Sequence, residues 1–259
     1  MITHENNLPV LILFNLTDHA AMPWIENGHD VVSVDPQHIN NETVYYPRYK
    51  ARHIKRACTA EEYLQEYKQS LVRKNFGIVI AFPVCTHLAV SGARHWKKKR
   101  EANPDFQSDA VESARIATQF DGIPYVIENP VGALSTLWQP PTGYVHPWEF
   151  GGYLPTDDTH PDYPDVIPPR DAYPKKTGLW CGNGAVMPVK NPVSKPVGFS
   201  GAYTMLGGSS TRTKNIRSAT PRGMAIAIYK ANRHLCDVFE DPARDERRLL
   251  AWERMNDRR

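Results

Sequence analysis

A cysteine and a glutamate, whose side chains could act together on one substrate, each lie at or just after the end of an apolar segment. Cys85 comes three residues after the run "FGIVIAF", and Glu128 stands near the end of the run "PYVIEN". Short continuous apolar runs are typical of strands that are covered on both faces in a parallel sheet. Because the ligand crevice of an open parallel sheet lies beyond the carboxyl ends of its strands, we expect Cys85 and Glu128 to face one crevice if these strands are neighbours.

A thiolate and a carboxylic acid together suit the activation of a pyrimidine ring. The sulfur adds to ring carbon 6 while the acid holds ring nitrogen 3, and carbon 5 then becomes nucleophilic enough to accept one carbon. A purely structural interpretation stays open at this point, in which Cys85 is a small buried hydrophobe and Glu128 caps the following turn. The spacing alone does not decide between the two interpretations.

Strands and helices are predicted to alternate over the first half of the chain. Apolar runs predict strands at residues 9–14, 30–35, 76–82 and 124–129. Helical patterns cover residues 17–28, 59–75 and 105–120, the second of them opened by a capping box of Thr59 and Glu62. This alternation predicts an α/β fold with a doubly wound, mostly parallel sheet.

The second half of the chain differs from the first in composition and in hydrophobic periodicity. From residue 130 to 208 the chain is rich in proline, glycine, tyrosine and tryptophan and shows little periodicity, apart from a strand-like run at 177–181. A structureless loop of that length is implausible inside a compact domain, so we predict a small irregular insertion. A helical pattern returns at 218–235, with Pro221 near its first turn.

Charge and cysteine usage narrow the function classes. The net charge of +3 is too small to establish a polyanionic partner, but "RHWKKKR" at 94–100 gathers five fixed positive charges after the cysteine, either as a solvated basic face or as a contact to phosphates. Four scattered cysteines without a CxxC pair argue against a zinc module or a disulfide framework. The acidic stretch "DDTHPDYPD" around His160 lacks a spacing that converges metal ligands, and we predict no metal site.

The sequence shows neither a membrane-spanning run nor a signal peptide. No apolar run approaches the length that crosses a bilayer, and the first residues lack the order of a signal peptide. We therefore expect no membrane partner, and a cytoplasmic location. The sequence shows no evident protein partner.

Four stretches, in this order, resemble the DNA cytosine-5 methyltransferase family, in particular its short forms from bacteriophage genomes. They are "LFNLTDHAAMPWIENGHDVVSVD", "FPVCTHLAVSG", "IENP" and "ATPRGMAIAIYKA", and "KKTGLW" is loosely similar to the basic strand that touches the flipped base. The resemblance implies a Rossmann-like methyltransferase fold, methyl transfer to carbon 5 of cytosine in DNA, and the cytoplasm of a host cell if a phage encodes the protein. It also implies a catalytic domain of residues 1–133 and 209–240 and a small target-facing insertion at 134–208. The charges of both signs at helical spacing in the tail separately predict a C-terminal surface helix at 241–259.

The resemblance assigns roles to individual residues. Cys85 would be the nucleophile and Glu128 the acid, Asn129 would brace the loop, and Lys176 or its neighbour Lys175 would take the place of the family's arginine. S-adenosylmethionine would be the cofactor, with Phe14 against its adenine and Asp35 accepting from its ribose hydroxyls; the cofactor site would comprise Phe14, Asn15, Thr17, Asp35 and Pro83. A base inside a duplex must be flipped out to reach such a pocket, so the loop after the nucleophile is expected to bind DNA. The DNA-contacting residues would be Ser91, Arg94, Trp96, Lys97, Lys98 and Lys99.

One motif departs from the family. Its members open with a glycine-rich loop that lets the cofactor approach the backbone closely, whereas this chain has Leu16, Asp18 and His19 at or near those positions. Three possibilities stay open: S-adenosylmethionine sits differently, methylenetetrahydrofolate is the donor and leaves a hydroxymethyl group, or the protein binds DNA without turnover.

Overall fold

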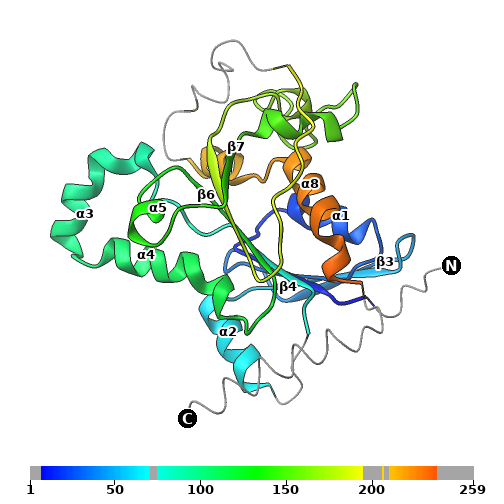
Figure 1. Ribbon diagram of the computed structural model, residues 1–259, viewed down its shortest axis with the longest axis horizontal. Helices are drawn as coiled ribbons and strands as arrows, with labels where there is room; N and C mark the ends of the chain where they lie inside the picture. Colours follow the sequence, from blue (N-terminus) through cyan, green and yellow to red (C-terminus); the bar gives the residue numbers. More distant parts are fainter. Residues whose placement is uncertain (1–6, 71–74, 195–205, 207–209, 238–259) are drawn as a thin grey trace.

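The computed structural model describes residues 7–70, 75–194, 206 and 210–237. Within these residues, eight strands form one sheet in the order β3-β4-β2-β1-β5-β6-β8-β7 (Figure 1). The strands are β1 Val10–Leu13, β2 Val31–Val34, β3 Glu42–Tyr46, β4 Ala51–Arg56, β5 Ile78–Ala81, β6 Tyr125–Pro130, β7 Gly143–Val145 and β8 Thr177–Gly182.

The centre of the sheet is parallel and its edges are antiparallel. Strands β4, β2, β1, β5 and β6 run in one direction. The edge strand β3 is antiparallel to β4, and β8 is antiparallel to both β6 and β7. The prediction of an α/β fold with a mostly parallel sheet is therefore confirmed, with the addition that the sheet is mixed.

Helices cover both faces of this sheet. The α-helices are α1 Met22–Ile25, α2 Ala60–Gln69, α3 Trp96–Ala102, α4 Phe106–Arg115, α5 Leu134–Leu137, α7 Thr211–Ser218 and α8 Arg222–Asn232. Short 3-10 helices are η2 Asp18–Ala20, η3 Val90–His95, η4 Ile116–Gln119, η5 Pro147–Tyr153, η6 Pro169–Asp171 and η7 Arg233–Leu235. Buried residues of α2 and α4 join one apolar core and those of α1 and α8 join the other, on opposite sides of the strands (Figure 1).

Local sequence signals account for several of these boundaries. Thr59 accepts from the backbone N–H of Glu62 at the start of α2, and the Glu62 carboxylate accepts from the N–H of Thr59 at 2.8 Å. Gly28, with a φ of 83°, ends the turn after α1 in a conformation that suits glycine. The helix that we expected over 105–120 is α-helical to Arg115 and then tightens into η4. The expected helix at 59–75 reaches Gln69, and residues 71–74 lie outside the described residues, as does the expected helix at 241–259.

Three strands were not predicted. The strands β3, β4 and β7 lack a continuous apolar run. For β3 the reason is that it is an edge strand, whose side chains are exposed or half-buried. Both β7 and β8 come from the expected insertion at 134–208 and extend the main sheet beyond β6. The division of the chain into a catalytic domain and an insertion stays a prediction.

None of the helices in the described residues combines the length and the apolar character that a membrane crossing needs.

Candidate functional site

A cavity of about 540 Å³ lies at the carboxyl ends of β1, β2, β5 and β6. Cys85 and Glu128 line it together with Phe14 and Asp35. Its volume falls in the range of small-molecule sites, which is roughly 300–1,000 Å³. The two groups of residues that the sequence assigned to a nucleophile and to a cofactor thus share one continuous cavity.

Cys85 lies in a tight turn just after β5. Its carbonyl oxygen accepts from the backbone N–H groups of Leu88 and Ala89 at 3.0 and 2.8 Å, which closes the turn and leaves the side chain half-buried in the cavity wall. Burial raises the pKa of the Cys85 thiol, the positive charge of Lys175 opposes that shift, and Glu128 adds to it. Cys85 lines the cavity, and Lys175 is the neighbour whose charge favours its thiolate.

Glu128 projects from β6 into the same cavity and is 8% exposed. The hydroxyl of Thr177, at the start of β8, donates to its Oε1 atom. Thr177 is itself buried, and it lies opposite Pro130 in the antiparallel pairing of β6 and β8. This neutral donor fixes the carboxyl group without adding a charge, a contact that the sequence analysis did not predict.

The nucleophile loop, residues 83–92, is attached to the chain that leaves β6. The side-chain amide of Asn129 donates to the carbonyl of Pro83 at 3.1 Å, so the bracing contact implied by the resemblance is present. Two backbone bonds follow, from Val90 to Val131 at 3.1 Å and from Ala133 to Leu88 at 2.8 Å.

Gly132 lies between these two bonds and forms an isolated bridge with Ala89. A Cβ atom at Gly132 would overlap the carbonyl of Leu88, so the close approach requires glycine.

The two neighbouring lysines differ in their surroundings. Lys175 lines the cavity, and its ammonium donates to the carbonyl of Arg217 at 3.3 Å. Lys176, which we had placed at the base, is not among the cavity residues, and its ammonium lies 4.6 Å from the centre of the Tyr144 ring. Because adjacent residues of an extended chain point in opposite directions, the structure brings Lys175, and not Lys176, to the cavity that Cys85 and Glu128 line.

The other end of the cavity begins at Phe14, whose φ of 58° is unusual for an aromatic residue. Asn15 is buried and donates to Ser33, whose hydroxyl is 2.8 Å from Nε2 of the buried His53. Asp35 is also buried, and one of its carboxylate oxygens accepts from the N–H of Gln37 at 2.8 Å.

Every member of the expected cofactor set, Phe14, Asn15, Thr17, Asp35 and Pro83, lines the cavity.

The residues that replace the glycine loop point in two directions. Leu16 and Thr17 line the cavity. The carboxylate of Asp18 instead pairs with Lys55 at 3.1 Å, and the ring of His19 pairs with Asp162 at 2.9 Å. Asp18 and His19 are not among the cavity residues, so their side chains anchor the loop and leave the space beside Phe14 open.

His19, His160 and Asp162 form a cluster whose potential metal-ligating atoms lie within 4.8 Å of one another. Nδ1 of His160 accepts from the backbone N–H groups of Asp162 and Tyr163 at 3.2 and 3.1 Å. A neutral imidazole that accepts at Nδ1 carries its proton on Nε2 and has no free lone pair there for a metal. The cluster therefore suits a structural contact between η2 and the segment around His160 better than a metal centre.

The basic stretch after the nucleophile forms η3 and α3. Ser91, His95 and Lys99 line the mouth of the cavity, and the Lys99 ammonium donates to the carbonyl of Thr86 at 2.8 Å. Trp96 is half-buried. Arg94, Lys97 and Lys98 are exposed and are not among the cavity residues.

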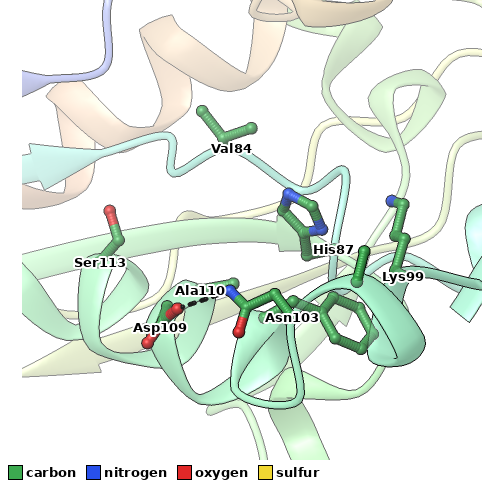
Figure 2. A pocket seen from close by; sticks show the side chains of 9 residues that line it. Val84, His87, Lys99, Asn103, Asp109, Ala110 and Ser113 are labelled. Carbon is green, nitrogen blue, oxygen red and sulfur yellow. Dashed lines mark hydrogen bonds between the residues drawn. The ribbon is translucent and has the colours of Figure 1, made fainter.

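A second cavity, of about 390 Å³, lies between α3 and α4 (Figure 2). Its floor includes Phe106 and Ala110, and Asn103 donates to Asp109 at 3.2 Å on its rim. Val84 and Lys99 line both cavities, so these two residues stand in the wall between them.

One wall of the main cavity was not predicted. Helix α7 and the residues after it contribute Lys214, Asn215, Arg217, Ser218, Ala219, Thr220 and Pro221. The segment "TRTKNIRS" has too few apolar residues for a periodic pattern, and only its three basic residues could have drawn attention to it.

Comparison with known proteins adds no assignment, since neither a protein-family model nor a curated protein matches the chain.

Proposed function

We propose that the protein transfers one carbon to carbon 5 of cytosine in DNA through a covalent adduct at Cys85, on a Rossmann-like methyltransferase fold. One observation carries the proposal: Cys85 and Glu128 line the same cavity as Phe14 and Asp35. A nucleophile, an acid and a separate space for a carbon donor are the three parts that this reaction needs. The resemblance of the sequence stretches around these residues supports the same reaction.

The reaction follows from the positions of these side chains. The Cys85 thiolate forms a bond to carbon 6 while Glu128 shares its proton with nitrogen 3, and the electron pair released in the ring makes carbon 5 nucleophilic. After carbon 5 has gained the new carbon, its own proton leaves to a base. The carbon–sulfur bond then breaks, which restores the aromatic ring and the free thiolate.

The residues at the far end of the cavity fit a nucleoside-containing donor. Asp35 is a buried acceptor at the end of β2, where α/β sheets hold ribose hydroxyls, and Phe14 offers an aromatic surface. When bound, S-adenosylmethionine would supply an electrophilic methyl group to this site. We take it as the first choice.

A second donor is favoured by the loop that replaces the glycines. The side chains of Leu16 and Thr17 line the cavity where the family presents bare backbone. Methylenetetrahydrofolate would supply its carbon to the same activated ring, and addition of water would leave a hydroxymethyl group. The chemistry of Cys85 and Glu128 is the same for both donors.

The first experiment is covalent trapping with DNA that contains 5-fluorocytosine. Fluorine at carbon 5 cannot leave as a proton does, so the adduct persists after transfer and migrates as a protein–DNA complex in denaturing gels. We expect an adduct with at least one of the two donors, and complete loss of it in Cys85→Ser, with DNA binding retained. Absence of an adduct with both donors would contradict the enzyme and leave a DNA-binding protein. Unfolding of Cys85→Ser would support a structural role for the thiol.

Mass spectrometry of the nucleosides separates the donors. Unmodified DNA is incubated with each donor and digested to nucleosides. 5-Methylcytosine with S-adenosylmethionine supports methyl transfer, and 5-hydroxymethylcytosine with methylenetetrahydrofolate supports the second candidate.

A further inference from the structure

Helix α7 adds positive charge to the cavity that α3 also lines through Lys99. Lys214 and Arg217 are exposed, yet both line the cavity, so they stand at its rim and not in its depth. Residues three apart share one face of a helix, so the two side chains project in the same direction. The adjacent face of α7 is buried through Thr213 and Ile216, which fixes the orientation of the helix.

The charge at the rim is not balanced locally. Among the described residues that line the cavity, the fixed cations are Lys99, Lys175, Lys214 and Arg217, and the carboxylates are Asp35 and Glu128. Both carboxylates are buried, at 6% and 8% exposure, and α7 itself contains no acidic residue. Like charges that gather at one rim repel one another unless an anion binds between them.

Lys214 and Arg217 keep donors available for such an anion. The side chain of Lys214 makes no hydrogen bond or ion pair with any residue that the structure describes. Arg217 donates to the carbonyl of Leu206, which uses part of a guanidinium that has five N–H donors. Arg212 on the same helix differs, because it pairs with Asp165 at 2.7 Å and is not among the cavity residues.

We propose that α7 is a phosphate-contacting element, in which Lys214 and Arg217 hold backbone phosphates of the DNA strand that carries the target base, across the cavity mouth from α3. The proposal rests on the proposed function, because it requires DNA at that mouth. A strand whose base enters the cavity has phosphates on both sides of the flipped nucleotide. Cations on α3 would meet one flank and those on α7 the other.

The experiment measures DNA affinity over a series of salt concentrations. Each phosphate contact contributes about 0.9 to the slope of log affinity against log salt for duplex DNA. We expect Lys214→Gln to lower the slope by about 0.9 and the double variant Lys214→Gln with Arg217→Gln to lower it by about 1.8. Arg212→Gln, the matched control, should keep the wild-type slope. An unchanged slope in both α7 variants overturns the proposal, and the single variant keeps the test valid if loss of the Leu206 contact disturbs folding.

Two further readouts separate the possible outcomes. In trapping with 5-fluorocytosine DNA, the α7 variants should need more DNA than the wild type to reach half of the maximal adduct, since Lys214 and Arg217 act in DNA binding. If the wild type forms no adduct but the slope still falls, the proposed function fails and the phosphate contact stands. Competition with deoxycytidine monophosphate tests a free nucleotide. If the α7 variants weaken its binding as much as that of DNA, the cations hold a single nucleotide phosphate, and the strand contact is wrong.

Discussion

The two ends of the cavity are held in place by different forces. At the nucleophile end, backbone bonds such as Val90 to Val131 attach the cysteine loop to the chain that leaves β6. At the donor end, the loop after Phe14 is held by ion pairs and imidazoles, among them Asp18 with Lys55 and His19 with Asp162. Backbone hydrogen bonds do not titrate, whereas the imidazole of His19 does, and burial lowers its pKa. The segment that carries Cys85 is thus held by backbone hydrogen bonds, and the loop after Phe14 depends in addition on a contact that responds to pH.

The largest effect on the rate is expected from a substitution at Gly132, where the nucleophile loop contacts the chain that leaves β6. In Gly132→Ala the new methyl group meets the carbonyl of Leu88 and pushes the nucleophile loop away from Glu128. A misplacement of about 1 Å costs roughly 100-fold in rate, which single-turnover adduct formation would measure. Gly122→Ala is the control: its φ of 69° makes alanine costly there too, but it has no close neighbours and does not line the cavity, so the rate should hold. Equal losses in both variants would mean that general destabilisation is the cause.

A smaller loss of rate is expected when Glu128 stays in place but no longer accepts the hydrogen bond from Thr177. Thr177→Val removes the hydroxyl that donates to Glu128 while keeping the shape of the side chain. We expect up to about a tenfold lower rate, since a typical hydrogen bond contributes about 0.5–1.5 kcal/mol. Thr177→Ser should restore most of the activity. A valine variant with wild-type rate and pH profile would show that the hydroxyl does not position the acid.

The two lysines before β8 provide a sharper comparison at the nucleophile. Lys175 lowers the pKa of the Cys85 thiol against the larger effect of burial, so Lys175→Gln should raise that pKa and reduce the thiolate fraction at neutral pH. Alkylation of Cys85 by iodoacetamide, followed by peptide mass spectrometry, should slow by up to about fivefold, as a partly screened charge pair allows. Lys176→Gln should react like the wild type, and the reverse ranking would return the role to Lys176.

The smallest effect is expected on stability, at the donor end. Burial lowers the pKa of His53 and of His160 to about 4. Between about pH 6.5 and 4 the unfolded chain therefore binds protons that the folded chain does not, and stability falls as the pH drops through this window. Asp171, whose pKa burial raises to about 6, opposes this trend with a single group. Urea unfolding midpoints should thus be lower at pH 4.5 than at pH 7.

The variant His53→Gln tests whether this histidine causes the pH dependence of stability. Without an imidazole at this position, the difference between the two midpoints should shrink. If the variant shows the wild-type difference, His53 is not the source.

Local patterns predicted most of the sheet and the nucleophile end. A buried strand must stop before Cys85, and Glu128 stands at the end of the next parallel strand, so their meeting at one edge follows from topology. The β3 strand carries no such pattern, because an edge strand has few side chains to bury.

Contacts between distant segments had no sequence signal at all. The pairing of His19 with Asp162 joins segments from different halves of the chain. The choice between Lys175 and Lys176 depends on which way an extended segment faces, and the bond from Thr177 to Glu128 depends on the register of β8 against β6. Each of these is decided by tertiary packing, which neither composition nor periodicity reports.

The attachment of the cysteine loop to the end of β6 has one more consequence. Glu128 belongs to that strand, and the same stretch of backbone, through Asn129 and Ala133, grips the segment that carries Cys85. Any shift of β6 would therefore carry both reacting groups along together and preserve the gap between them.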